Sequence, residues 1–433
     1  MDLVDGRREL VGGVTTFAAM AYILAVNPAI LSETGMDRGA LITATALASA
    51  IMTTVMALAT NYPIALAPGM GINAFFTFEL VKGKAIAPEA ALGLVVLSGA
   101  VFLALSLTPL RREVARAIPV HLRQAIGGGI GMFLAFIGLK NAGFIADHPA
   151  TLVTLGTLDL RHLLFLGGLL LAAGLHRAGK PYAFLASIGA TTAAALALPA
   201  PAHLAPHEWA RLPERLAQAP DLSLVFAADI GSALRVSLIP PLLTLLFTDL
   251  FDSLSTFLGV AQAADLLDED GEPINLERAL LVDATATLAS GLVGTSPATT
   301  YVESTAGVEA GGRTGWTAVV AGVAFLPFAF LAPLVEVVPA FATAPILVLV
   351  GALMARSTAG LGERPLEERL PAFLVMILIP LTFSITSGIL WGLVLHPLLF
   401  VLAGRRGALR RMTWALFGVG VGLLVLEHGA LLR

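Results

Sequence analysis

The sequence predicts an all-α polytopic membrane protein with about fourteen transmembrane spans in two inverted repeats of seven. Of the 433 residues 57% are apolar and only 13% are charged, about half the charged fraction of a soluble domain. The apolar residues fall in blocks of about 15–22, the length that crosses about 30 Å of hydrocarbon as a helix. These blocks lack the alternation of a transmembrane barrel, which excludes that class together with soluble enzymes.

The blocks form two sets of seven on either side of a polar stretch, residues 201–235. The first set comprises 14–32, 41–60, 68–82, 90–108, 119–142, 160–177 and 181–199. The second set comprises 238–260, 276–293, 297–310, 314–333, 339–357, 369–384 and 386–403. An odd number of spans in each half inverts one half relative to the other. A last block, 412–430, is either a further crossing or a helix on the membrane surface.

The basic clusters orient this array. Arginine, lysine and histidine gather at residues 7–8, 111–116, 176–180 and 405–411, and all four clusters lie on one side if the N-terminus is cytoplasmic. We therefore expect a multi-pass protein of the cytoplasmic (inner) membrane. The charged N-terminus lacks a cleavable signal pattern, so the first span is expected to remain.

Several chemistries are excluded by residues that the sequence lacks. There are no cysteines, which rules out disulfides and thiolate metal sites. No Walker motif occurs, so this chain alone is not expected to drive transport with ATP. No basic surface indicates nucleic acid, and neither a cofactor nor a metal site is predicted.

The third span of each half is interrupted. Each opens with a small residue followed by proline, at 67–68 and at 296–297, and each carries a polar residue shortly afterwards, Asn73 and Glu303. Interrupted spans at matching places in two halves indicate the midplane site of a transporter. Asn73 can equally satisfy backbone at the break. Glu303 could cap the broken helix or hold it through a polar contact, although serine or threonine would suffice for a cap.

Acidic residues inside the spans are the strongest functional candidates, because an ionisable group there is costly. Asp249 and Asp252 are three residues apart, so they share a helix face that Thr256 extends. Their span contains no basic residue to pair with them. The structural alternative is a carboxylate pair that hydrogen-bonds to neighbouring backbone or hydroxyl groups.

Other polar residues within or near the spans have simpler explanations. Asp283 and Lys140 are structural or near the interface, His396 is a packing histidine, and His203 and His207 belong to a solvated loop.

Two or three carboxylates among hydroxyl groups suit a small polar solute, because carboxylates accept N–H donors from a planar heterocycle and can also carry a proton. This combination predicts proton-coupled uptake. An intramembrane aspartyl hydrolase would need its two acids from different elements, whereas Asp249 and Asp252 lie on one helix. A channel would need a continuous polar stripe, and only local polar clusters occur. We therefore predict a carrier and not an enzyme.

Several motifs carry a resemblance to a known family. They are GVTTFAAMAYILAVNPAIL (13–31), NYPIALAPGMGINAFFTF (61–78), IGLKNAGFI (137–145), FTDLFDSLSTFLGVA (247–261), GTSPATTYVESTAGVEAGGRTG (294–315) and PLTFSITSGI (380–389). From about residue 10 to 403 the chain resembles the purine permeases of the nucleobase:cation symporter family, in their AzgA-like hypoxanthine/guanine/adenine branch. The resemblance implies import of these purines with protons, an elevator-like motion, and possible homodimers formed through the gate domains.

The resemblance also implies a division into domains. Residues 1–109 and 237–336 would form a core domain, in which short extended segments of spans 3 and 10 pair near the midplane. Residues 110–200 and 337–411 would form a gate domain. An extracytoplasmic linker, 201–236, joins the halves, and 412–433 is the C-terminal apolar segment.

Site residues follow from the same resemblance. Asp249 and Glu303 map onto the acids that contact substrate, Asn73 onto the polar residue of span 3, and Asp252 onto a second acid of span 8. We expect Asp249, Asp252 and Glu303 to couple the proton, and Phe75 or Phe76 to cover the purine ring. The TDLFD sequence replaces the glutamate typical of uracil and xanthine carriers, although a uracil, xanthine or small-anion carrier on the same fold remains the alternative.

Overall fold

The computed structural model describes residues 6–108, 118–205, 208–268, 273–409 and 411–427. The predicted basic cluster at 111–116, together with His207 and Arg410, lies outside the described residues. Within the described part, seven helices are long and apolar enough to cross a membrane. They are Gly6–Thr34, Arg38–Thr60, Pro88–Ser106, Val120–Asn141, Val236–Ala263, Ala340–Glu363 and Ile385–Leu402.

The first half of the chain alternates long helices with one short strand and one hairpin. Its elements are α1 (Gly6–Met20), α2 (Ile23–Leu31), α3 (Arg38–Thr60), β1 (Leu66–Pro68), α4 (Met70–Ala74), the π-helix η2 (Phe75–Gly83), α5 (Pro88–Ser106), α7 (Val120–Asn141), β2 (Ile145–His148), β3 (Leu152–Leu155), α8 (Leu160–Arg177) and α9 (Ala183–Ala197).

The second half also alternates helices with one short strand. Its elements are α10 (Ile230–Ala233), α11 (Ile239–Ala263), α12 (Leu276–Val293), β4 (Ala298–Thr300), α13 (Ser304–Glu309), α14 (Gly315–Phe325), α15 (Ala332–Glu336), α16 (Ala340–Met354), the 3-10 turn η6 (Ala355–Thr358), α17 (Leu366–Thr382), α18 (Ile385–Leu402) and α19 (Arg411–Glu427).

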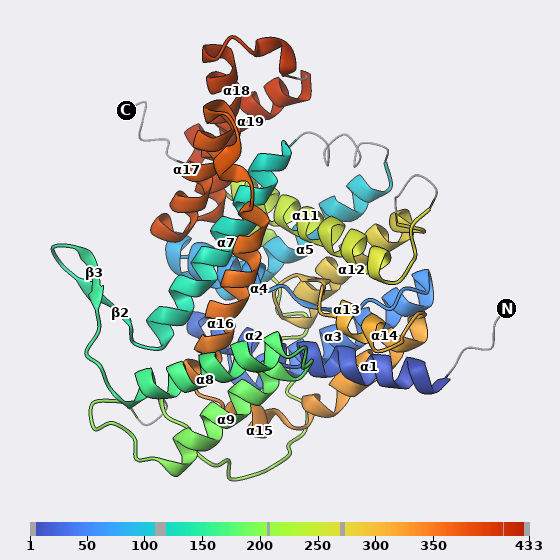
Figure 1. The fold of residues 1–433 in the computed structure, drawn as a ribbon, viewed down its shortest axis with the longest axis vertical. Coiled ribbons are helices and arrows are strands. Elements are labelled where there is room, and N and C mark those ends of the chain that lie inside the picture. Colours follow the sequence, from blue (N-terminus) through green and yellow to red (C-terminus); the bar gives the residue numbers. More distant parts are fainter. Residues whose placement is uncertain (1–5, 109–117, 206–207, 269–272, 410, 428–433) are drawn as a thin grey trace.

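Two predicted boundaries need correction. The chain is already helical from Gly6, ahead of the predicted start at residue 14, and the side chain of Glu9 is buried in this added part. Glu9 accepts hydrogen bonds from the backbone amides of Arg313, Thr314 and Thr317, at 3.2, 3.3 and 3.1 Å. The hairpin β2–β3 was not expected within the loop after α7, and it projects at the left edge of the molecule, away from the N-terminus (Figure 1).

Strands β1 and β4 bring together two segments that lie far apart in the sequence. They pair antiparallel, with Leu66 opposite Thr300 and Pro68 opposite Ala298, and all six residues are buried. A proline restricts the residue before it to extended conformations, which explains why 67–68 and 296–297 do not continue as helices. The pair lies where α3, α11 and α12 converge.

The helices pack in two groups (Figure 1). One contains α1, α3 and α14 and the pair α5 with α12, and the other contains α7 with α16 and α17. Helices α7 and α16 approach so closely that only glycine fits at their crossing. A Cβ at Gly131 would lie 2.6 Å from the carbonyl oxygen of Gly351, and one at Gly351 would lie 2.3 Å from that of Gly131. Such small-residue contacts are the usual means of close helix packing in membranes.

Candidate functional site

Asn27 organises the buried polar groups beside the paired strands. Its Nδ2 donates to Oγ1 of Thr45 (2.8 Å) and of Thr295 (3.0 Å). Its Oδ1 accepts from Nδ2 of Asn73 (3.1 Å) and from the hydroxyl of Ser296 (3.3 Å). Asn73, predicted to contact a ligand, is fully buried and held by Asn27, while its own Oδ1 has no hydrogen-bond partner among the described residues. Sequence reasoning missed Asn27, although an amide inside an apolar block signals it.

Asp249 lies in α11 against α12. Its Oδ2 accepts a hydrogen bond from the Thr287 hydroxyl, and its Oδ1 has no partner among the described residues. Ser253, one turn further along α11, is 2.8 Å from Thr299 of β4 and so joins the helix to the strand. Asp283 of α12 is also fully buried and interacts electrostatically with Asp249. The structure therefore places Asp283 beside the predicted acids Asp249 and Asp252.

Glu303 precedes α13 without capping it through its side chain. It accepts instead a hydrogen bond of 2.6 Å from the phenol of Tyr22, at the break between α1 and α2. The capping explanation for Glu303 is therefore wrong, because its side chain makes no capping hydrogen bond to α13, whereas the bond from Tyr22 fits a polar contact that holds the broken helix. Tyr22 was not identified from the sequence, and its only signal is a tyrosine within an apolar block. A second phenol, Tyr301, donates to the carbonyl of Pro68 at 2.5 Å and locks β4 to β1.

Asp252 faces a cavity of about 410 Å³. The cavity lies between α7 and α11, and residues of α16, η6 and α18 complete its lining. The lining residues are Val120, Arg123, Gln124, Ile126, Gly127, Ile130, Phe247, Thr248, Phe251, Asp252, Ser255, Met354, Ser357 and Ile389. A cavity of this volume is within the range of small-molecule sites. Asp252 interacts electrostatically with both Asp249 and Glu303, so the three predicted acids lie close together.

The other predicted residues stand outside this lining. Asp249, Asn73 and Phe75 are buried behind it, with Phe75 only 1% exposed. The aromatic side chains on the cavity are Phe247 and Phe251, which lie on α11 and not in the third span. Both lie on the same side of α11 as Asp252, and the helical spacing of the three residues in the sequence could have indicated this.

A buried acid links the third span to α18. Glu79 of η2 accepts hydrogen bonds from the backbone amides of Ile385 (2.6 Å) and Thr386 (3.3 Å) and from the hydroxyl of Ser384 (3.0 Å). The carboxylate thus caps the N-terminus of a helix about 300 residues away, where negative charge is favoured. Sequence reasoning also missed Glu79.

The remaining polar candidates lie away from the cavity. His396 is buried with its Nδ1 3.2 Å from Nε2 of His121, which confirms its packing role. Lys140 is exposed at the end of α7.

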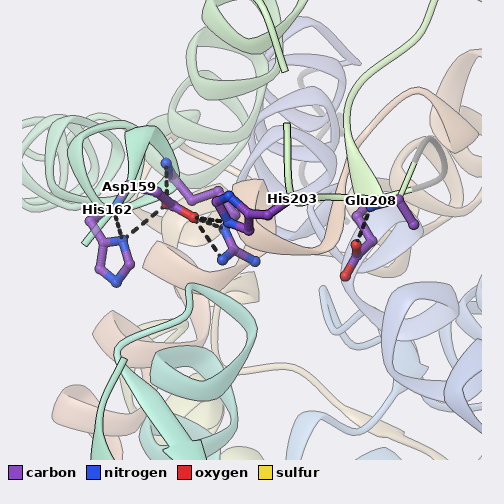
Figure 2. A network of polar contacts seen from close by, with 6 residues as sticks. Asp159, His162, His203 and Glu208 are labelled. Atoms are coloured by element: carbon purple, nitrogen blue, oxygen red, sulfur yellow. Dashed lines mark hydrogen bonds and ion pairs between the residues drawn. The ribbon is translucent and has the colours of Figure 1, made fainter. Parts of the chain in front are cut away.

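Asp159 and its neighbours form a separate polar network at the start of α8 (Figure 2). Asp159 accepts from the backbone and guanidinium of Arg161 at 2.8 Å and contacts His162 and His203 at 3.1 and 3.0 Å. Burial raises the pKa of the Asp159 carboxyl, but these hydrogen bonds and the Arg161 charge outweigh that effect and lower the pKa to about 2. His203 is therefore not simply solvated, since it attaches the segment after α9 to α8.

Comparison with known proteins identifies the family. Residues 7–391 match the model of the Permease family, Xan_ur_permease. The chain belongs to this family. It is 40% identical over 410 residues to the guanine/hypoxanthine permease PbuO of Bacillus subtilis, covering 92% of each protein. It is 37% identical over 403 residues to the adenine permease AdeP of Escherichia coli, covering 92% of this chain and 88% of that protein. The chain is accordingly a multi-pass membrane permease and not an enzyme.

Solved structures share the fold at low identity. The transmembrane domain of the cyanobacterial bicarbonate transporter BicA superposes with a TM-score of 0.68 at 18% identity, over 90% of this chain and 98% of that one. SLC26A9 superposes with a TM-score of 0.64 at 9% identity, over 92% of this chain and 65% of that one. The predicted all-helical membrane fold is thereby confirmed, whereas the count of fourteen spans in two inverted repeats stays a prediction.

Proposed function

We propose that this permease imports purine nucleobases, namely hypoxanthine, guanine and/or adenine, across the cytoplasmic membrane together with protons. The observation that carries the proposal is the gathering of Asp249, Asp252 and Glu303 beside the β1–β4 pair. Among the described residues no lysine or arginine forms an ion pair with these acids. Relatives named as guanine/hypoxanthine and adenine permeases support purines as the cargo.

In this proposal, purine N–H groups donate to Asp249 and Glu303, Asn73 contributes a polar contact, and Phe75 packs against the ring. A proton on one of the three acids travels with the base. A carboxylate suits both tasks, because it accepts N–H donors when ionised and donates one hydrogen bond when protonated.

The proposed architecture has fourteen spans in two inverted repeats, with the N-terminus in the cytoplasm. Spans 3 and 10 are interrupted at β1 and β4, and the antiparallel pairing of these strands supports that interpretation. A core domain (1–109 and 237–336) would slide against a gate domain (110–200 and 337–411), within a homodimer formed through the gate domains. The two packing groups, α1, α3, α5, α12 and α14 against α7, α16 and α17, support this division.

Uptake measurements in a cell that lacks its own purine transport test the proposal. Radiolabelled hypoxanthine should accumulate faster at acidic than at alkaline external pH, and a protonophore should abolish the difference. Guanine or adenine should compete, whereas uracil and sulfate should not. Competition by uracil or sulfate, without any by purines, would assign the chain to the alternative carriers and refute the proposal.

A further inference from the structure

The cavity beside Asp252 has two walls of different character. The α11 wall presents a carboxylate, Asp252, with the hydroxyl groups of Thr248 and Ser255 on the same face. The α7 wall presents the guanidinium of Arg123, which only donates, and the amide of Gln124, which both donates and accepts. A ligand between these walls meets an acceptor on one side and a cationic donor fork on the other.

Arg123 is held in place by packing and not by an ion pair. Its guanidinium carbon lies 5.7 Å from the centre of the Phe251 ring, across the cavity on α11, a cation–π distance. No ion pair within 4.0 Å joins it to an acid in the part of the chain that the structure describes. Its Nε, the Oε1 of Gln124 and the Oγ1 of Thr248 are all buried without a hydrogen-bond partner among those residues.

Buried polar atoms without partners are uncommon, and each calls for an explanation such as a ligand or an ordered water. Three of them gather here around one cavity, on both walls. Arg123 and Asp252 have opposite charges and line the same space without contacting each other. A flat, uncharged ring with donors on one edge and acceptors on the other would satisfy both walls.

We propose that Arg123 is a specificity-determining residue that selects 6-oxopurines, guanine and hypoxanthine, over adenine; this inference rests on the proposed function. With the base lying in the cavity, the guanidinium fork donates to O6 and N7, and Asp252, the one predicted acid that lines the cavity, accepts from a ring N–H on the opposite edge. Asp249 and Glu303, which stand outside this lining, would receive the base at a second position. Arginine pairs with O6 and N7 of guanine in the same way in nucleic-acid recognition, whereas glutamine matches N6 and N7 of adenine. Adenine carries an amino group at position 6, so its N–H donors would face the guanidinium donors.

The test is equilibrium binding to the purified full-length protein. Radiolabelled hypoxanthine is displaced by unlabelled guanine or adenine in the wild type, in Arg123→Gln and in Arg123→Lys. The control is Arg356→Gln, which removes an exposed arginine of η6 that does not line the cavity. If Arg123→Gln does not fold, Arg123→Lys still tests the idea, because lysine keeps the charge but loses the planar fork.

The wild type should bind guanine more tightly than adenine. The ratio of the two affinities should fall by about tenfold in Arg123→Gln, the discrimination expected of one bidentate pair. It should fall less in Arg123→Lys and stay unchanged in Arg356→Gln. An unchanged ratio in both Arg123 variants, or a wild type that prefers adenine, would overturn the inference. A wild type that binds none of the three bases would instead overturn the proposed function.

Discussion

The capping of α18 by Glu79 allows a quantitative prediction. Glu79 is 3% exposed and accepts three hydrogen bonds, at 2.6, 3.0 and 3.3 Å. Replacing it with alanine leaves the amides of Ile385 and Thr386 buried without an acceptor. Each buried amide without an acceptor lowers the free energy of unfolding by about 1–3 kcal/mol. Partial relaxation of the helix end makes the total loss smaller than the sum for the two amides. We expect Glu79→Ala to destabilise the protein by about 3 kcal/mol.

Thermal unfolding of the purified protein in detergent measures this loss, with Glu33→Ala as the matched control. Glu33, which follows α2, is exposed and forms an ion pair with the exposed Lys82 at the end of η2, so its removal should cost about 0–1 kcal/mol. Glu79→Gln should fall between the two, since its amide oxygen can still accept one bond. Equal unfolding temperatures for Glu79→Ala and Glu33→Ala would refute the capping argument.

Three further predictions concern two substitutions and one change of pH. Gly131→Leu should prevent stable insertion, because even a Cβ there would lie 2.6 Å from the backbone of α16; the yield of folded protein measures this. Tyr22→Phe removes the hydrogen bond to Glu303 and should lower hypoxanthine uptake by about tenfold, the worth of one bond to a charged group. The contact between Asp159 and His203 should weaken only in strong acid. The pKa of the Asp159 carboxyl is lowered to about 2, so the ionised carboxylate stabilises the fold fully above about pH 4. This stabilisation is lost as the pH falls through 2. Cleavage of segment 208–228 by pepsin should therefore rise between pH 4 and pH 2, and should be high throughout this range in Asp159→Asn.

Each of these predictions has its own control. Gly167→Leu adds a side chain on α8 where nothing lies within 4 Å, so it should insert normally. Tyr182→Phe alters an exposed phenol and should not affect uptake. Asp147→Asn alters an exposed acid of the β2–β3 hairpin and should leave cleavage unchanged. Normal folding of Gly131→Leu, normal uptake by Tyr22→Phe, or cleavage of the wild type that does not change with pH would each contradict the corresponding interpretation.

Much of the fold could be read from the sequence, because hydrophobic block length and charge placement follow directly from the bilayer. The predicted blocks 160–177 and 276–293 coincide with α8 and α12. The first helix was underestimated because charged residues were assigned to a loop, whereas Glu9 finds its partners at the start of α14. Partners distant in the sequence are not visible in one chain's local pattern.

The candidate site, too, could be predicted from the sequence only in part. Asp249, Asp252 and Glu303 were identified because ionisable groups stand out against apolar blocks. Their hydrogen-bond partners, such as Tyr22, are residue types that are common in helices, so nothing local marked them. Phe75 is predicted at the ring face from its position after the break; it is buried and outside the cavity lining in this structure, and its contact with the base stays a prediction. Which side of a short interrupted helix faces a cavity depends on tertiary packing.

The central claim is that the acids beside the paired strands bind the purine and carry the proton. Hypoxanthine uptake by Asp249→Asn and by Glu303→Gln tests this most directly, with Glu33→Gln as a surface control and the amount of inserted protein measured for each variant. Both substitutions keep the size of the side chain but remove its charge and its proton. We expect both variants to insert normally and to take up no hypoxanthine in response to a proton gradient, while the control is unaffected. Normal proton-driven uptake by both variants would contradict it.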